Sequence, residues 1–239
     1  MARTASFEAN TERYEQWFER HDAAYRSELV ALRQIAPSSR LELEIGVGTG
    51  RFAEPLGVAV GLDPSPRMLA SARARGVSAV RGVAEALPFH DGAFDLVLIV
   101  TTICFVDDAH AMLREAGRVL RADGSLIVGF IDRESRLGRY YQDHRVESPF
   151  YRDAVFYSAA EVEGLLAETG FAAREWAQTL CAPLVQVTEG ERPRAGHGEG
   201  AFVAVRAGKS AEWKGSVEAG EEERGCTSYH RSRGATSLP

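Results

Sequence analysis

Three glycines and an acidic residue in this chain stand at spacings that suit a nucleotide-like ligand. The glycines follow the apolar run 41–45 at alternate positions, Gly46, Gly48 and Gly50. Glycine lets the chain turn sharply and lets backbone N–H groups approach a ligand closely. Asp63 ends the next apolar run, where a carboxylate can accept hydrogen bonds from both hydroxyls of a ribose. The pattern therefore predicts a nucleotide-type ligand at the ends of two neighbouring strands.

The spacing of the glycines distinguishes two kinds of cofactor. Nicotinamide-binding folds use G-x-G-x-x-G/A, which requires glycine or alanine at position 51, and this chain has Arg51 there. The third glycine comes one residue earlier, and Glu44 precedes the first glycine by two residues. This E-x-G-x-G-x-G version resembles class I S-adenosylmethionine (SAM)-dependent methyltransferases. The resemblance implies that Glu44 organises the cationic amino group of the methionine portion, directly or through water.

Further segments between residues 41 and 131 carry the same resemblance. Residues 82–89, GVAEALPF, resemble the family's "g-d-a-e-x-l-P-f" loop, and residues 92–95, GAFD, resemble the "sFD" that opens the fourth strand. Residues 118–124, RVLRADG, look like the "RVLkpGG" turn, with Asp123 in place of the first glycine. Together these motifs are typical of the type 11 branch of the family.

The flanking segments are similar to a set of bacterial and archaeal proteins of the same branch, for which no acceptor is firmly established. The matching segments are VTTICFVDD at 100–108, DRES-LG at 132–138 and GEGAF at 198–202. The resemblance implies a methyltransferase and leaves the acceptor open.

The resemblance also implies a set of residues that hold SAM. They are Glu44, Gly46, Gly48, Gly50, Asp63, Pro64, Met68, Ala84, Glu85 and Thr101. Asp63 would accept the ribose hydroxyls, and Met68 could pack its thioether on the adenine. Val83 stands where many relatives have an aspartate that holds the adenine amino group. Backbone groups of Ala84 and Glu85 would therefore have to recognise the base.

The sequence names no catalytic residue, because a methyl group on a sulfonium is already activated and needs no protein nucleophile. Thr101 ends the fourth expected strand, where this family faces the transferred methyl group. His21 and Tyr25 stand four residues apart on one expected helical face and could line an acceptor pocket, with His21 as a candidate base. Cys104 lacks the preceding proline of cytosine-5 methyltransferases, so we expect a buried structural thiol.

Apolar runs that alternate with helical patterns predict an α/β protein. We expect strands at 41–45, 58–62, 77–80, 94–100, 125–131, 171–180 and 200–206. The fold expected is a doubly wound, mostly parallel, seven-stranded Rossmann-like sheet with an antiparallel last strand and an N-terminal helical lid. Such sheets bind ligands at the carboxyl ends of their strands, near the point where the strand order reverses.

The chain divides into three expected parts. Residues 1–36 carry aromatic side chains at helical spacing, which suit either a helix packed on the sheet or a lid over the ligand. Residues 37–207 form the expected SAM-binding methyltransferase domain. Within it, residues 132–157 form an aromatic-rich insertion on the acceptor side that suits a pocket wall or a dimer contact. Residues 208–239 are polar with balanced charges, and we expect them to be disordered.

Composition limits the partners and the compartment. The 239-residue chain has a net charge of −6 at pH 7, which argues against nucleic acid, because that partner usually requires a basic face. Its three cysteines are widely separated, so we expect neither a disulfide framework nor a metal site. No apolar run is long enough to span a membrane, and the first residues lack a signal core. We therefore expect a cytoplasmic protein without membrane contact, and its oligomeric state is left open.

The sequence thus predicts an enzyme that moves the methyl group of SAM to a nitrogen or oxygen atom of a small-molecule acceptor. Two alternatives stay open, a SAM-binding protein without transfer activity and a nicotinamide-dependent oxidoreductase; a protein acceptor also stays open. Arg51 and the motif at 82–89 disfavour the oxidoreductase, and the intact glycines and Asp63 disfavour an inactive binding protein.

Overall fold

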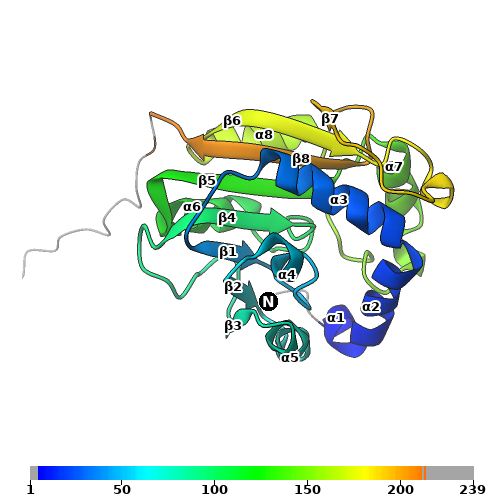
Figure 1. The fold of residues 1–239 in the computed structure, drawn as a ribbon, viewed down its shortest axis with the longest axis horizontal. Helices are drawn as coiled ribbons and strands as arrows, with labels where there is room; N and C mark the ends of the chain where they lie inside the picture. The colour runs from blue at the N-terminus through cyan, green and yellow to red at the C-terminus, as the bar shows by residue number, and fades with distance from the viewer. Residues whose placement is uncertain (1–4, 212, 214–239) are drawn as a thin grey trace, which may run out of the picture.

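One mixed β-sheet forms the centre of the protein, and helices cover both of its faces (Figure 1). The computed structural model describes residues 5–211 and residue 213. The strands are β1 (Glu42–Ile45), β2 (Val60–Asp63), β3 (Ser78–Arg81), β4 (Phe94–Val100), β5 (Leu120–Ile131), β6 (Phe171–Thr179), β7 (Arg194–Ala195) and β8 (Phe202–Lys209). The helices are α1 (Ala5–Ala9), α2 (Thr11–Arg20), α3 (Asp22–Ile35), α4 (Ala53–Leu56), α5 (Pro66–Ala74), α6 (Ala109–Val119), α7 (Arg136–Asp143) and α8 (Ala159–Glu168), with 3-10 turns η1 (Arg145–Glu147) and η2 (Leu184–Gln186).

The strands have the order β3-β2-β1-β4-β5-β8-β6-β7. The strands from β3 to β5 in this order run parallel, whereas β8 lies between β5 and β6 and is antiparallel to both. This confirms the expected doubly wound α/β sheet with an antiparallel last strand. The expected strand number of seven is wrong, because Arg194 and Ala195 pair with Gln178 and Ala177 and add β7 at the edge.

The strand order reverses beside β1, which lies between β2 and β4. The register pairs Ile45 of β1 with Leu62 of β2 and with Ile99 of β4, so the three strands end at the same level. Chain segments that leave adjacent strands in opposite directions open a crevice at such a point. In Figure 1 this edge faces right, where α1, α2 and α7 lie beyond the strand ends.

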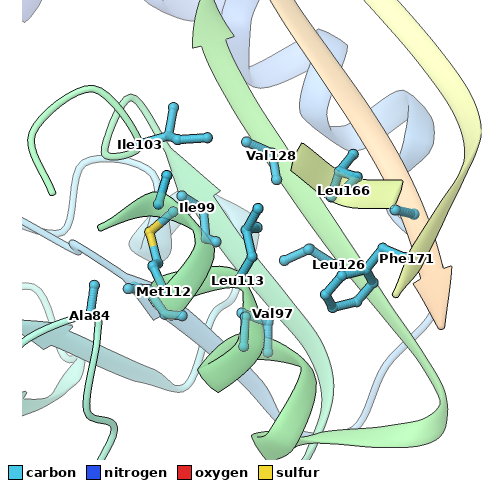
Figure 2. Packing of buried hydrophobic residues seen from close by; sticks show 14 of the residues in the cluster. Ala84, Val97, Ile99, Ile103, Met112, Leu113, Leu126, Val128, Leu166 and Phe171 are labelled. Carbon is cyan, nitrogen blue, oxygen red and sulfur yellow. The ribbon is translucent and has the colours of Figure 1, made fainter. Parts of the chain in front are cut away.

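Two apolar layers enclose the sheet, and β4 contributes to both. Val97 and Ile99 pack in the layer that contains Met112 and Leu113 of α6 (Figure 2). Leu98 points to the opposite layer, which contains residues of α3 and α5. All five side chains are at most 1% exposed. Burial on both faces fixes β4, and therefore fixes the position of Thr101 at its end.

The residues expected to be helical between 7 and 36 form three helices rather than one. The breaks fall at Asn10 and His21, whose φ angles of −126° and −119° are not helical. The Asn10 side chain donates a hydrogen bond of 2.8 Å to the Ser6 carbonyl, which closes α1. The two breaks turn α1 and α2 along the carboxyl edge, while α3 packs on the sheet (Figure 1).

The strand β5 is longer than expected, because it begins at Leu120 rather than Ser125. Leu120 pairs with Phe94, and an irregular step follows before Ser125 pairs with Leu96. The expected turn at 123–124 is therefore an irregularity within the strand.

The expected boundary at residue 208 is also corrected. The strand β8 continues to Lys209, and the ring of Trp213 lies 5.3 Å from the ring of Phe171. The structured part of the chain thus extends past the boundary that the polar composition suggested. The rest of the expected disordered tail, residue 212 and residues 214–239, lies outside the described residues.

The insertion at 132–157, which has no clear period in the sequence, contains the helix α7. Ser135 caps this helix, because its Oγ accepts a hydrogen bond of 2.9 Å from the Gly138 N–H. A Cβ at Gly138 would lie 2.8 Å from the carbonyl carbon of Asp132, so glycine is required there. This contact explains the spacing in the DRES-LG segment.

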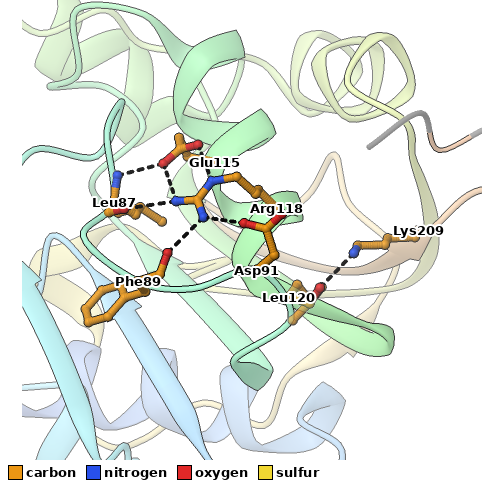
Figure 3. Close-up of polar contacts among 7 residues, drawn as sticks. All are labelled: Leu87, Phe89, Asp91, Glu115, Arg118, Leu120 and Lys209. Carbon is orange, nitrogen blue, oxygen red and sulfur yellow. Dashed lines mark hydrogen bonds and ion pairs between the residues drawn. The ribbon is translucent and has the colours of Figure 1, made fainter. Parts of the chain in front are cut away.

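An ion-pair network holds the loop that follows β3 (Figure 3). The Arg118 guanidinium donates hydrogen bonds of 2.9 and 2.8 Å to the carbonyls of Leu87 and Phe89. It also pairs with Glu115 and Asp91, each at 2.7 Å. Glu115 in turn accepts a hydrogen bond of 2.7 Å from the Leu87 N–H. The arginine of the RVL motif therefore fixes the loop that carries the expected adenine-binding residues.

This network predicts that Arg118→Met lowers the free energy of unfolding by about 3 kcal/mol. The substitution would leave the half-buried carboxylate of Glu115 and the carbonyls of Leu87 and Phe89 without their hydrogen-bond donor. The matched control is Arg121→Met, whose half-exposed guanidinium pairs with Asp95 at 2.7 Å. A solvent-exposed pair of that kind contributes little to stability, so its loss should be much smaller. Urea denaturation of the two variants measures both values, and equal losses would contradict the assigned role of Arg118.

Candidate cofactor and acceptor site

Two adjacent cavities lie at the carboxyl edge of the parallel strands. The smaller has a volume of about 100 Å³ and the larger a volume of about 370 Å³. Both cavities are lined by Phe7, Tyr14, Thr101 and Phe105. These residues form the boundary at which a ligand in one cavity can meet a ligand in the other.

The smaller cavity gathers most of the cofactor residues expected from the sequence. Those that line it are Gly46, Gly48, Asp63, Pro64, Met68, Ala84, Glu85 and Thr101. Glu44 and Gly50 do not line it. Gly50 instead packs on α5, where a Cβ would lie 3.2 Å from the Cα of Ala72. The strand register thus brings together residues from four separate stretches of the chain.

Gly46 is favoured both by a close neighbour and by a positive φ angle, and Gly48 by a positive φ angle. Gly46 has φ +73°, and a Cβ there would lie 2.8 Å from the Cβ of Thr102 and closer still to the rest of that side chain. Gly48 has φ +52°, and a Cβ there would lie 3.4 Å from the hydroxyl oxygen of Tyr14, an ordinary van der Waals contact. Larger residues at either position would fill or distort the floor of the cavity.

Asp63 is oriented by backbone hydrogen bonds at the end of β2. Its two carboxylate oxygens accept hydrogen bonds from the N–H groups of Gly48, at 3.0 Å, and Ser65, at 2.8 Å. Burial raises the pKa of Asp63, and these hydrogen bonds offset only part of that shift. Each oxygen retains acceptor capacity. A carboxylate held this way fits a pair of ribose hydroxyls.

Glu44 lies beneath the floor, with only 1% of its surface exposed. It accepts a hydrogen bond from the backbone of Ala53, while Oε2 has no partner among the described residues. Burial, and then the negative charge of Asp63, raise the pKa of Glu44 well above its ordinary value. A buried acidic oxygen without a partner fits a site that receives a cationic group.

The side of the smaller cavity that the sequence assigns to the adenine is formed by α5 and by the loop after β3. Met68 is 1% exposed and lines the cavity. The Glu85 carboxylate accepts hydrogen bonds from the N–H groups of Asp107, at 2.9 Å, and Asp108, at 3.4 Å. Its side chain therefore ties two loops together, and its backbone and that of Ala84 border the cavity.

Thr101 has an unusual backbone at the boundary between the cavities. Its φ of +49° lies in the left-handed region, which is uncommon for a β-branched residue. Its N–H donates a hydrogen bond of 2.7 Å to the Gly129 carbonyl, which holds this conformation against β5. Backbone strain of this kind often persists at functional sites.

The larger cavity has aromatic walls and one deeply buried acidic side chain. Its aromatic lining residues include Tyr14, Trp17, Phe18, Phe105, Phe130, Tyr140, Tyr141, Phe150, Tyr151 and Phe156. Glu28 of α3 also lines it and is 3% exposed. Sequence reasoning missed Glu28. The available signal was an acidic residue on the apolar face of a helix, three residues after Tyr25 and four before Leu32.

His21 and Tyr25 line neither of the two cavities, so the structure gives no support to their expected position in an acceptor pocket. His21 ends α2, and its Nδ1 lies 3.0 Å from the Trp17 carbonyl while its ring stacks on the Trp17 ring. Tyr25 donates its hydroxyl hydrogen bond to the Arg51 carbonyl. Both side chains are engaged in positioning α2 and α3.

Ion pairs attach α1 and α2 to the cofactor loops. The Glu15 carboxylate pairs with Arg51 at 2.5 Å and with Arg75 at 2.6 Å. Burial opposes this charge, but hydrogen bonds from Arg51 and Arg75 outweigh burial and lower the pKa of Glu15. On α1, Glu8 accepts a hydrogen bond from the Ser65 hydroxyl. Arg51, which departs from the nicotinamide pattern, is thus an anchor for α2.

Comparison with known proteins identifies the family. A family model described as a methyltransferase domain matches residues 43–128. A crystal structure from Thermotoga maritima, described as a SAM-dependent methyltransferase and possible histamine N-methyltransferase, matches with a TM-score of 0.85 and 47% identity, covering 87% of this chain and 100% of that chain. The chain belongs to the class I SAM-dependent methyltransferases. Its cofactor is therefore SAM, which excludes the nicotinamide-dependent oxidoreductase.

Two sequence relatives of this methyltransferase have no assigned activity. An uncharacterized protein of Methanocaldococcus jannaschii is 42% identical over 203 residues, 85% of this chain and 98% of that protein. An uncharacterized protein of Mycobacterium tuberculosis is 48% identical over 147 residues, 61% of this chain and 52% of that protein. The methyltransferase thus spans about half the length of the mycobacterial relative that it matches.

None of the helices in the described part has the length and apolar character needed to cross a membrane. Within residues 5–211 and 213, no three His, Cys, Asp or Glu side chains are grouped as metal ligands.

The geometry of the glycine loop predicts that Gly46→Ala lowers the free energy of unfolding by about 3 kcal/mol, from a left-handed backbone plus a steric clash with Thr102. Gly57→Ala is the matched control, because Gly57 has φ +75° and nothing within 4 Å of an added Cβ. That control should lose only about 1 kcal/mol, the backbone contribution. Chemical denaturation measures the difference, and a Gly46→Ala loss no larger than the control would contradict the clash.

Proposed function

We propose that this methyltransferase transfers the methyl group of SAM to a nitrogen or oxygen atom of a small-molecule acceptor bound in the larger cavity. The observation that carries the proposal is the shared boundary at Thr101, where a cofactor cavity adjoins a second, aromatic cavity. A cavity volume of about 370 Å³ lies within the range of small-molecule sites, about 300–1,000 Å³. A protein that only senses SAM has no need of this second cavity.

In this proposal the residues of the smaller cavity hold SAM. Asp63 accepts the ribose hydroxyls, the loop at Ala84 and Glu85 borders the adenine, and Met68 packs against the base. Glu44 compensates the cationic amino group from beneath the floor, directly or through water. The peptide segment 46–50 passes under the methionine portion. These assignments rest on the cavity lining and on the orphaned oxygen of Glu44.

Bound SAM supplies an activated methyl group on a sulfonium, so the chain contributes position rather than a nucleophile. Thr101, held by Gly129, fixes the boundary across which the acceptor atom approaches. Phe7 and Phe105 complete that boundary with apolar surface and exclude water. Holding two reactants in line at contact distance can lower the barrier by several kcal/mol. Oxygen and nitrogen are both retained as acceptor atoms; the Thermotoga maritima relative's description as a possible histamine N-methyltransferase supports nitrogen.

We also propose that α1 and α2 act as a lid. The smaller cavity, at about 100 Å³, is narrower than a site for a whole cofactor, and Phe7 and Tyr14 from these helices reduce it. The lid must therefore move outward to admit SAM. Its attachment through Glu15 to Arg51 and Arg75 resists that movement.

The cofactor assignment is tested by titration calorimetry with SAM, S-adenosylhomocysteine and NADH. We expect both sulfur nucleosides to bind and NADH not to bind. Asp63→Ala should weaken SAM binding by about 10- to 100-fold, because hydrogen bonds to a charged group contribute about 1.5–3 kcal/mol. The control Glu163→Ala changes an exposed carboxylate on α8 and should leave binding unchanged. Tight SAM binding by Asp63→Ala would contradict the ribose assignment.

The lid proposal predicts that Glu15→Gln increases both the association and the dissociation rate of SAM by about 3- to 30-fold, since it weakens two partly buried ion pairs that hold α2 closed. Glu12→Gln, an exposed acid on the same helix, serves as the control. Stopped-flow tryptophan fluorescence follows both rates, because Trp17 lies on α2. Rates equal to those of the control would mean that α2 does not gate the site.

A further inference from the structure

Glu28 is a buried carboxylate that the cofactor site does not use. It lies on α3, lines the larger cavity and is 3% exposed. No described residue gives it a hydrogen bond or an ion pair. Its pKa is raised to about 8, and burial is the cause. An ionised group in such a place is costly unless a partner of opposite charge joins it.

The walls around Glu28 favour a cation with an apolar body. Tyr14 of α2, Tyr141 of α7 and Tyr151 of the segment after η1 line the same cavity as Glu28. The charge of Glu28 contributes to the raised pKa of each of these tyrosines. Trp17 lines the same cavity and donates a hydrogen bond to the Tyr141 hydroxyl. Aromatic faces attract ammonium groups, and the attraction grows when water is excluded.

The described part of the chain does not provide the missing cation. Among the described residues that line this cavity, the arginines are Arg13 and Arg20, and there is no lysine. Both are solvent-exposed on α2, and neither pairs with Glu28. They lie at the rim with His144 and Glu147, which are also exposed. The interior of the cavity therefore has one acidic group, aromatic walls and no basic side chain.

We propose that the acceptor is a small amine that binds as a cation, with its ammonium group against Glu28 and its apolar body between the aromatic walls, and that Glu28 takes the proton which the nitrogen must lose. This inference rests on the proposed function, because it specifies the acceptor for the same site. Glu28 is then a catalytic residue that touches the acceptor rather than the cofactor.

The step balances without a further reactant. A proton moves from the ammonium nitrogen to a carboxylate oxygen of Glu28, which leaves a lone pair on nitrogen. That lone pair attacks the methyl carbon, so an N–C bond forms as the S–C bond breaks, and sulfur keeps the bonding pair as a neutral thioether. The product is a methylated ammonium ion. The proton on Glu28 leaves to solvent when the products dissociate.

The proposal fixes the pH dependence of kcat/KM. The productive complex contains one proton shared between Glu28 and the amine, so kcat/KM should rise to a plateau above the pKa of Glu28, about 8, and fall above the pKa of the free amine. The tyrosines that share the cavity with Glu28 and feel its charge, namely Tyr14, Tyr141 and Tyr151, remain neutral there, because burial raises the pKa of each. Burial also raises the pKa of Tyr25 on α3. The exposed rim groups are Arg13, Arg20, His144 and Glu147.

The test compares amines with alcohols of the same shape. Phenethylamine, cyclohexylamine and histamine are titrated into the wild-type complex with S-adenosylhomocysteine, alongside 2-phenylethanol and cyclohexanol. At least one amine should bind more tightly than its alcohol counterpart and should accept a methyl group from SAM. Glu28→Gln should reduce kcat/KM for that amine by at least about 30-fold, since it removes one partner of a buried charge pair. Its pH profile should rise only with the pKa of the free amine.

Controls separate this inference from the proposed function. Glu28→Gln should bind SAM as the wild type does, and Glu163→Gln should behave as the wild type throughout. Absence of SAM binding by the wild type would overturn the proposed function itself. Normal SAM binding with no preference for any amine over its alcohol would overturn only the present inference. The inference would also be overturned if Glu28→Gln retained amine methylation and the wild-type pH profile.

Discussion

The parallel register of β1 with β2 and β4 is the constraint on which the whole site depends. Pairing of Ile45 with Leu62 and Ile99 brings three strand ends to one level. The glycine segment, Asp63 and Thr101 then meet at a single edge, although more than fifty residues separate the first from the last. Close packing of β4 against both apolar layers opposes slippage, because a shift by one residue would place side chains of different size and shape in each layer.

Unpaired acidic charge is the second organising feature of the site. Burial raises the pKa of Glu28, Glu44 and Asp63, and each lies in or beneath one of the two adjacent cavities. Natural proteins bury such groups where function requires them, at some loss of stability. SAM brings a sulfonium and an ammonium group, and the proposed acceptor brings another cation. These cationic ligands would therefore supply the opposite charge that lets the buried carboxyl groups ionise.

The sequence predicted the parts of this structure that depend on local pattern. The apolar runs gave the strands, and the spacing of Gly46, Gly48 and Gly50 with Asp63 gave the cofactor edge, because both signals are short in sequence. The edge strand β7 was missed, since two residues in a polar loop carry no period. The start of β5 at Leu120 was missed because it depends on a partner in β4.

Contacts between distant segments explain why the positions of His21, Tyr25 and Glu28 could not be read from local sequence. His21 and Tyr25 were assigned to a pocket from helical spacing, yet the break at His21 turns α2 away from α3 and engages both side chains elsewhere. Glu28 was overlooked because an acid within a helix usually faces solvent. Its burial depends on tertiary packing, because α3 lies on β6 and β8, and residues of α7 and of the segment after η1, more than a hundred residues away, line the same cavity.

A crystal structure of the protein with S-adenosylhomocysteine tests the central claim most directly. The account predicts the ribose hydroxyls on the Asp63 carboxylate, the adenine beside Ala84 and Glu85, and the thioether sulfur beside Thr101, facing the aromatic cavity. Outward displacement of Phe7 and Tyr14 would accompany that pose. A ribose placed away from Asp63, or a sulfur that faces away from the aromatic cavity, would contradict the assignment of the two cavities.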